Sequence, residues 1–404
     1  TIPLWSAGGK WDISKEPFYH FKKIPNLSLR LTYGYQGNLD QNLAAITTLQ
    51  FSAFNASYTG LPFAAINNVP NPDLRWERTG QLNIGVDVGS RNNIISGRLE
   101  YFRKKGNDLI GDGIIDPTTG ISQLRGNFSD MKSHGFDIEL KSVNINGSNF
   151  KWSTNLIFNY SSEKVTRFDV NYGALTYFNA FATGRPLVGK PLYSVYSYQW
   201  GGLDPATGDP RVILADTLNK THSTQTTNNV KMQDLVYSGR YNAPIFGSLF
   251  NNFRWKGLGL TFNIIYKFNY VFRRTSINYS ALASNGWKTG HKDFVLRWKQ
   301  PGDEKLTNVP SIVYPANATR DAFYNQSELL IEKGDHIRLQ FVNLNYEFEN
   351  KLLKQISIQG LRLYFYVNNV GILWRANDKG IDPDYPFMTY PPARTYSFGI
   401  KARF

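Results

Sequence analysis

The residues Arg394-Thr-Tyr-Ser-Phe-Gly-Ile-Lys-Ala-Arg-Phe404 decide the fold of this chain. Counting back in twos from Phe404 to Tyr396 gives only apolar residues, and the positions between them are polar or glycine. Because successive side chains of a strand point to opposite faces, this pattern predicts a strand with one apolar and one polar face. About ten residues is also the length that a tilted strand needs to cross a bilayer. A half-buried edge strand of a soluble domain would show the same pattern, so the rest of the chain has to decide.

The same period of two recurs along the chain. In one of the longest runs, Leu258, Leu260 and Phe262 alternate with small or polar residues. Further runs lie at 82–88, 136–141, 152–160 and 361–368. Their polar sides carry Asn, Lys, Arg, Asp and Glu, which a protein core does not accept unpaired. One face of these strands therefore meets water.

One predicted strand changes phase. The odd-numbered positions are apolar in 337–341, and the even-numbered positions are apolar in 342–348. A β-bulge inserts one extra residue and so restores a common face. We therefore expect a bulge near Phe341-Val342.

The links between the runs alternate in length. Short links at 90–93, 146–149 and 256–257 have the composition of hairpin turns. Long polar links lie at roughly 37–77, 106–132, 163–191, 217–243, 274–334 and 371–392. Tight turns at one end and long loops at the other are typical of an outer-membrane barrel, whereas long structureless loops are unusual in a compact soluble domain.

Following the strand directions back from the C-terminal strand, which should end at the periplasm, gives about thirteen strands. They are expected at 3–13, 27–36, 79–88, 94–105, 134–145, 150–162, 192–201, 209–215, 245–255, 259–272, 335–347, 360–370 and 394–404. The pair 192–201 and 209–215 is placed in the barrel, joined by a turn at 204–208. An odd number of strands with open edges does not close a single-chain bacterial barrel. We therefore expect the remaining strands to precede Thr1, and residues 1–404 to form the C-terminal part of one barrel domain.

Composition limits the classes of function. Aromatic residues make up 15% of the chain and Cys is absent, which favours strands and excludes disulfides and thiolate metal sites. The net charge of +14 comes from scattered Lys and Arg, so we assign it to strand ends and a lumen wall rather than to nucleic-acid binding. The close pairs His291 with Asp293 and Asp335 with His336 are interpreted as surface hydrogen-bonding groups. We predict no enzyme activity, metal or cofactor.

Aromatic residues gather at or beyond the outer ends of the predicted strands. They allow two interpretations, a girdle of rings at the lipid headgroups or a stacking platform for sugar rings or side chains of a ligand. The loop 371–386 is rich in Gly, Pro and Asp and holds most of the candidates. The ligand-contact candidates are Trp287, Trp374, Arg375, Asp382 and Tyr385.

Several segments together resemble one family. They include Asn71-Pro-Asp-Leu-Arg-Trp-Glu-Arg78, Lys132-Ser-His-Gly-Phe-Asp-Ile-Glu139, Glu332-Lys-Gly-Asp-His-Ile-Arg-Leu339 and Tyr366-Val-Asn-Asn-Val-Gly371. In this order, and over nearly the whole chain, they resemble the C-terminal half of SusC/RagA-type TonB-dependent outer-membrane transporters.

The resemblance implies a 22-stranded transmembrane antiparallel β-barrel with an N-terminal plug, which is not in this chain and through which the TonB complex would act. It implies a SusD-like surface lipoprotein as a lid, and oligosaccharides or oligopeptides as cargo. Phe404, Tyr396 and Phe398 would form the signal read by the barrel-assembly machinery. Lipopolysaccharide and outer-membrane lipid would be further partners, the former meeting positive charge at the outer rim.

Two other classes of protein remain open at this point. A passive porin or structural envelope barrel would continue uptake after the proton gradient is collapsed. A soluble β-sandwich that binds carbohydrate would be extracted without detergent.

Overall fold

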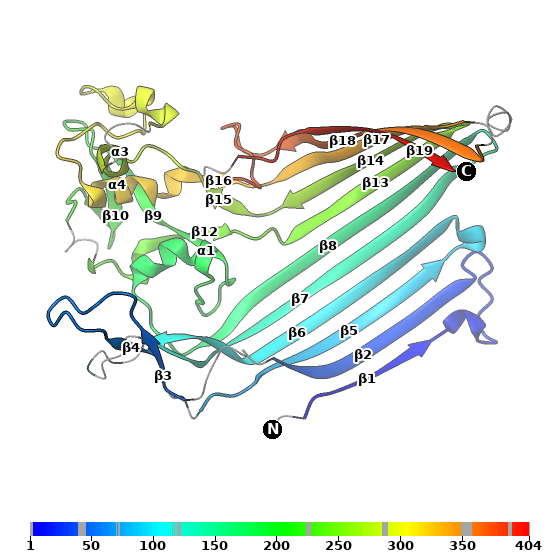
Figure 1. Cartoon of the computed structure of the whole chain (residues 1–404), viewed down its shortest axis with the longest axis horizontal. Coiled ribbons are helices and arrows are strands. Elements are labelled where there is room, and N and C mark those ends of the chain that lie inside the picture. Colours follow the sequence, from blue (N-terminus) through cyan, green and yellow to red (C-terminus); the bar gives the residue numbers. More distant parts are fainter. Residues whose placement is uncertain are drawn as a thin grey trace.

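The computed structural model describes residues 3–38, 46–69, 71, 73–114, 116, 118, 123–223, 228–284, 290–348, 358–386 and 390–403. Eleven of its strands form one curved antiparallel sheet, which we call the wall (Figure 1). They are β1 (Trp5–Trp11), β2 (Asn26–Asn38), β5 (Glu77–Gly89), β6 (Ile95–Ile114), β7 (Gln123–Asn146), β8 (Phe150–Phe168), β13 (Ile245–Trp255), β14 (Leu258–Phe268), β17 (His336–Glu347), β18 (Gly360–Arg375) and β19 (Thr395–Arg403). They are hydrogen-bonded in this order, so the wall is a single layer and not a sandwich.

The prediction is confirmed for eleven of the thirteen strands and wrong for two. The segments expected at 192–201 and 209–215 form β9 (Ser194–Leu203) and β10 (Pro210–Leu214), which belong to a separate four-stranded sheet. Strand β8 instead pairs directly with β13, with Tyr160 opposite Ile245. Adding two strands between β8 and β13 leaves the directions of both unchanged. Strand directions alone therefore could not show whether β9 and β10 belong to the wall.

The short links lie together at one end of the wall, near the C-terminus, and the long links at the other (Figure 1). Strands β13 and β14 meet at Lys256-Gly257, where Lys256 has a φ of +50° and a Cβ on Gly257 would lie 2.4 Å from the Glu347 carbonyl oxygen. The predicted long loop at 106–132 is mostly strand. Strands β6 and β7 extend into this segment as a paired hairpin, with register shifts around Asp108.

The predicted change of phase in β17 is confirmed as a bulge one residue earlier. On β14, Asn263 pairs with Phe341 and Ile264 with Leu339, so Gln340 is the extra residue. The bulge brings Leu339 and Val342 to the same face of the wall.

The two faces of the wall have opposite chemistry. One face carries apolar side chains that no other element covers, such as Leu99 at 44% and Phe136 at 42% exposure. The other carries ion pairs between strands, including Asp87 at 2.8 Å from Arg30 and 2.9 Å from Arg98. The wall is therefore built for lipid on one side and water on the other.

Most of the long links fold into a second region, which we call the cap; the loop that follows β18 is not counted in it (Figure 1). Its strands, with β9 and β10, are β3 (Thr48–Phe51), β4 (Ala64–Asn68), β11 (Thr217–Asn219), β12 (Leu235–Arg240), β15 (Val271–Arg273) and β16 (Ile331–Lys333). Its α-helices are α1 (Ala180–Thr183), α3 (Tyr279–Ser284) and α4 (Ala318–Asn325). Short 3₁₀ helices are η4 (Ala174–Asn179), η5 (Met232–Asp234), η6 (Lys292–Leu296), η7 (Asp303–Lys305) and η8 (Glu328–Leu330) in the cap, and η1 (Ile13–Lys15) and η2 (Arg91–Asn93) at the short links.

The cap contains ordinary hydrophobic packing. One cluster joins η4, β9, β10 and α4 through rings such as Phe178, Tyr198 and Phe323. A second cluster joins α3 to Tyr324 and Leu330. Because β9 and β10 bury their apolar residues here, their alternation comes from a core and not from lipid.

A buried arginine ties the cap segments together. Arg273 of β15 donates from Nη1 to the Phe178 carbonyl at 3.2 Å and from Nη2 to the Tyr196 carbonyl. Burial lowers its pKa to about 10, so the guanidinium is still charged at neutral pH. In the described ranges, no helix is long and apolar enough to cross a membrane.

Candidate functional site

A cavity of about 300 Å³ lies where the cap meets the loop that follows β18. We call it the mouth cavity. The cap contributes Arg274, Thr275, His291, Lys292, Asp293, Leu296 and Val309, and the loop contributes Lys379, Ile381, Tyr385 and Pro386. The lining combines several cations with an aromatic ring and aliphatic side chains.

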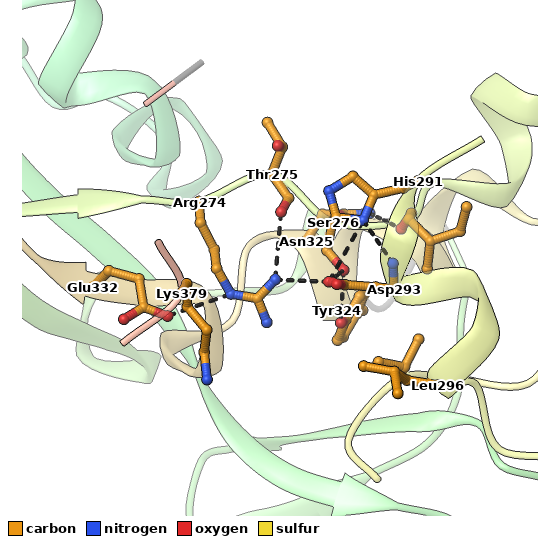
Figure 2. A network of polar contacts seen from close by, with 12 residues as sticks. Arg274, Thr275, Ser276, His291, Asp293, Leu296, Tyr324, Asn325, Glu332 and Lys379 are labelled. Carbon is orange, nitrogen blue, oxygen red and sulfur yellow. Dashed lines mark hydrogen bonds and ion pairs between the residues drawn. The ribbon is translucent and has the colours of Figure 1, made fainter. Parts of the chain in front are cut away.

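The cap side of this cavity is held by a polar network (Figure 2). Arg274 Nη1 and Ser276 Oγ both donate to Asp293 Oδ2, at 2.7 and 2.6 Å. On its other side, Arg274 Nε lies 3.4 Å from Glu332 Oε1. Arg274 thus lies between two carboxylates, and its Nη1 also donates to the Thr275 carbonyl at 3.4 Å, so the position of the guanidinium is well defined.

The protonation states of the network follow from burial and hydrogen bonding. Burial opposes the ionisation of Asp293, but hydrogen bonds from Ser276 and Arg274 outweigh it and hold its pKa below the usual range. Burial lowers the pKa of His291 despite the nearby Asp293 carboxylate. His291 is therefore neutral at pH 7, and its Nδ1 accepts the Asp293 backbone N–H at 3.1 Å. Burial raises the pKa of Glu332, with Arg274 opposing the shift.

The loop after β18 is anchored on the wall by two carboxylates. Asp382 pairs with Arg338, and Asp384 lies 2.7 Å from Lys267 Nζ and 3.2 Å from Nε2 of the fully buried His336. Burial opposes the ionisation of Asp384, but His336 and Lys267 bring its pKa far below the usual range. The anchor thus joins Asp382 and Asp384 to polar and charged groups at the outer ends of β14 and β17, and it fixes the loop side of the mouth cavity.

The structure separates the ligand-contact candidates. Tyr385 lines the mouth cavity, whereas Arg375 and Asp382 both line a second, more open hollow of about 700 Å³. Asp382 is also used in the anchor, and Arg375 donates to the Gly380 carbonyl at 3.0 Å. Trp374 lies opposite Ile337 on the apolar side of the wall, 48% exposed, as expected for a girdle residue. Trp287 and Phe404 lie outside the described residues, and Tyr396 and Phe398 are exposed on β19.

Sequence reasoning missed Arg274 and Lys379, and it placed Asp293 and His336 on the surface, although both are buried. The period of two contains no information about these contacts, because their partners lie far apart in the chain. The sequence feature nearest to a signal is the pair Asp382 and Asp384, whose carboxylates could bind the basic residues at the start of β17.

The family follows from a comparison with known proteins. Residues 2–370 match the family model described as TonB dependent receptor-like, beta-barrel. The chain belongs to this family. Its TonB-dependent receptor barrel is an outer-membrane fold, so the apolar side of the wall faces lipid, the short turns are periplasmic, and the cap lies outside the cell.

Individual relatives of this TonB-dependent receptor barrel agree with that assignment. The TonB-dependent receptor P26 of Formosa agariphila is 24% identical over 99% of this chain and 42% of its own length. The TonB-dependent receptor SusC of Bacteroides thetaiotaomicron is 21% identical over 100% of this chain and 40% of its own length. A structure of the RagAB peptide transporter shares the fold, with a TM-score of 0.78 at 22% identity, over 98% of this chain and 42% of that one. The chain thus spans about two fifths of the length of these relatives.

Proposed function

We propose that this chain is part of an active outer-membrane importer of oligosaccharides or oligopeptides, energised by TonB and closed by a SusD-like surface lipoprotein. The observation that carries the proposal is the folded cap over the outer end of a lipid-facing wall. A passive pore or scaffold needs no separately packed region at its mouth. The name SusC for one relative and the description of RagAB as a peptide transporter support the proposal of an importer.

The wall supports the part that the chain plays in that importer. Its edge strands β1 and β19 each pair with a single neighbour among the described residues. Backbone groups in a bilayer must be hydrogen-bonded, so both edges require further strands. We therefore treat residues 1–404 as part of one barrel domain whose other strands, with a plug that TonB contacts, complete the protein.

The mouth cavity is the ligand contact that this chain offers best. Tyr385 presents a ring that suits a sugar face or an apolar side chain, and the aliphatic groups around it exclude water. Arg274 is already paired with Asp293 and Glu332, so the lysines of the lining, Lys292 and Lys379, are the groups that can bind acidic parts of the cargo. Trp287, Arg375 and Asp382 remain proposed contacts, the last two in the second hollow, whereas Trp374 is a weaker one because it lies on the apolar side of the wall.

Uptake in the native bacterium tests the function. Labelled oligosaccharide and oligopeptide pools are offered to cells with the full-length receptor, before and after a protonophore collapses the proton gradient. We expect uptake of one pool to stop on addition of the protonophore. Continued uptake would establish a passive channel instead.

The site is tested with Tyr385→Ala in the same assay. We expect a loss of roughly two- to tenfold in cargo affinity, because one stacking contact contributes about 0.5–1.5 kcal/mol. Tyr58→Ala is the matched control, since Tyr58 is fully exposed in the 46–69 segment and lines no part of the mouth cavity. Equal effects of the two substitutions would remove Tyr385 from the site.

A further inference from the structure

Three lysines lie side by side across three neighbouring strands of the wall. Lys105 of β6 pairs with Lys132 of β7, and Lys132 pairs with Lys164 of β8. Directly opposed residues have Cβ atoms about 5 Å apart on the same face, and like charges in such pairs are destabilising. All three side chains are exposed. We call this group the lysine row.

The lysine row lies on the lipid-facing side of the wall, beyond its apolar band. On the same face and nearer the periplasm, Tyr101, Phe136 and Tyr160 form a cross-strand row of rings. The lysine row follows four residues further along each strand, about 14 Å toward the cap. Rings at the edge of an apolar band mark the headgroup level, so the lysines lie among the headgroups of the outer leaflet.

Two arginines on neighbouring strands extend the positive charge of the lysine row. Arg78 of β5 and Arg103 of β6 line a hollow of about 390 Å³ together with Lys105. Tyr33 and Tyr35 form another part of its lining, and the Arg78 guanidinium lies 5.9 Å from the centre of the Tyr35 ring. Cations and rings thus combine in one hollow on the outside of the wall.

The protein neutralises this charge only in part, since the Asp130 carboxylate attracts Lys105 without forming an ion pair with it. Asp130 accepts hydrogen bonds from Arg167 at 3.0 and 3.1 Å, and Asp108 is paired with Arg75 at 3.0 Å, so the nearby carboxylates are already engaged. In the part of the chain that the structure describes, Lys105, Lys132 and Lys164 are in no ion pair. The corresponding positions at the periplasmic end of these strands are uncharged, with Ser142 opposite Thr154.

From this arrangement we infer that the lysine row, with Arg78 and Arg103, binds the phosphate groups of lipopolysaccharide. Lipopolysaccharide places several phosphates at the level of the row and acyl chains against the apolar band below it. Each lysine contributes a mobile point charge suited to phosphate, and the spacing of the row matches an anion with more than one phosphate better than a single ion. The site is a binding surface for the surrounding lipid and does not depend on the transport function.

Binding to the full-length receptor in nanodiscs tests the inference. The triple variant K105Q/K132Q/K164Q is compared with the natural protein for affinity toward purified lipopolysaccharide and for the amount of lipopolysaccharide that copurifies, measured by mass spectrometry. We expect a loss of roughly tenfold or more, since each basic side chain near an anionic lipid surface contributes appreciably to binding. The control triple K22Q/K23Q/K151Q removes the same charge at the periplasmic end and should leave the affinity unchanged.

The source of the anion is distinguished on the natural protein. Enzymatically dephosphorylated lipopolysaccharide and phosphatidylglycerol should each bind more weakly by a similar factor, and millimolar inorganic phosphate should not displace lipopolysaccharide. Unchanged affinity of the lysine-row variant overturns the inference, as does equal binding of phosphatidylglycerol or displacement by phosphate alone. Heat-modifiable migration shows whether the variant folds. If it does not fold, the natural protein alone decides: equal binding of native and dephosphorylated lipopolysaccharide would overturn the inference.

Discussion

The wall and the cap belong to one chain, but they are held together in different ways. Most of the largest fully buried side chains, including Tyr198, Phe178 and Phe323, lie in the cap, and His336 and Val165 are the exceptions in the wall. The wall consists of half-exposed side chains on a paired backbone, with Leu99 and Phe136 open to the bilayer. The cap is therefore stabilised by burial away from water, as a soluble domain is, and the wall by strand pairing and by lipid. The same substitution should have different consequences in the two regions.

The largest effect is expected for Phe323→Ala in the cap. Phe323 is fully buried, with its ring 5.2 Å from the centres of the Tyr198 and His222 rings. Removing it should destabilise the cap by about 3–5 kcal/mol, while the wall keeps its fold. Limited proteolysis should cut the cap of a receptor that still migrates as a folded barrel. Loss of both properties together would show that the two regions fold as one unit.

A smaller effect is expected when a charge enters the lipid face of the wall. Leu99→Arg should cost up to about 2–4 kcal/mol, because the guanidinium cannot be solvated within the apolar band of the wall. Refolding into liposomes at graded urea concentrations measures this. Leu218→Arg is the control, since Leu218 is similarly exposed but lies in the cap, where water solvates the charge. An equal cost at both positions would contradict the lipid-facing assignment.

Removing the anchor charge should have a more local effect. Asp384→Asn keeps the size of the side chain but weakens its contacts with Lys267 and His336, at a cost of about 2 kcal/mol. Hydrogen exchange should rise in 376–386 and remain unchanged in β6 and β7. A uniform rise over the wall would show that the loop anchor supports the barrel as a whole.

Mild acid should loosen the cap before the wall. Because burial lowers the pKa of His291, the unfolded state takes up its proton first, and stability is lost as the pH falls below about 6.5. The depressed pKa values of Asp293 and Asp384 add stability at neutral pH that is lost only in stronger acid, below about pH 4. Proteolysis between pH 7 and 5.5 measures the first step. His291→Gln should abolish it, and a step that persists in this variant would assign it to another group.

The smallest effect is expected for an ion pair on the water side of the wall. Arg98 is largely exposed, and solvent screens its interaction with Asp87. Arg98→Gln should cost no more than about 1 kcal/mol in the urea midpoint of the reconstituted receptor. A larger cost would mean that the ion pairs of the inner face contribute substantially to the stability of the barrel.

The sequence allowed much more to be predicted about the wall than about the cap. A strand between lipid and water needs an alternating pattern, so β14 and β18 are visible in the residues themselves. The same alternation in β9 arises from Tyr196 and Tyr198 packing into a core, and so its position was wrong. The mouth cavity could not be predicted because Arg274, Asp293 and Tyr385 meet only through tertiary packing.

The direct pairing of β8 with β13 has an evolutionary consequence. The cap segment between them leaves the wall at one strand and returns at its neighbour, where Ser161 N donates to the Pro244 carbonyl at 2.9 Å. An insertion whose ends lie one strand spacing apart, about 5 Å, can be lengthened, shortened or exchanged without altering the register of the barrel. This part of the cap can therefore be exchanged as a cassette, while the pairing of the lipid-facing strands stays the same.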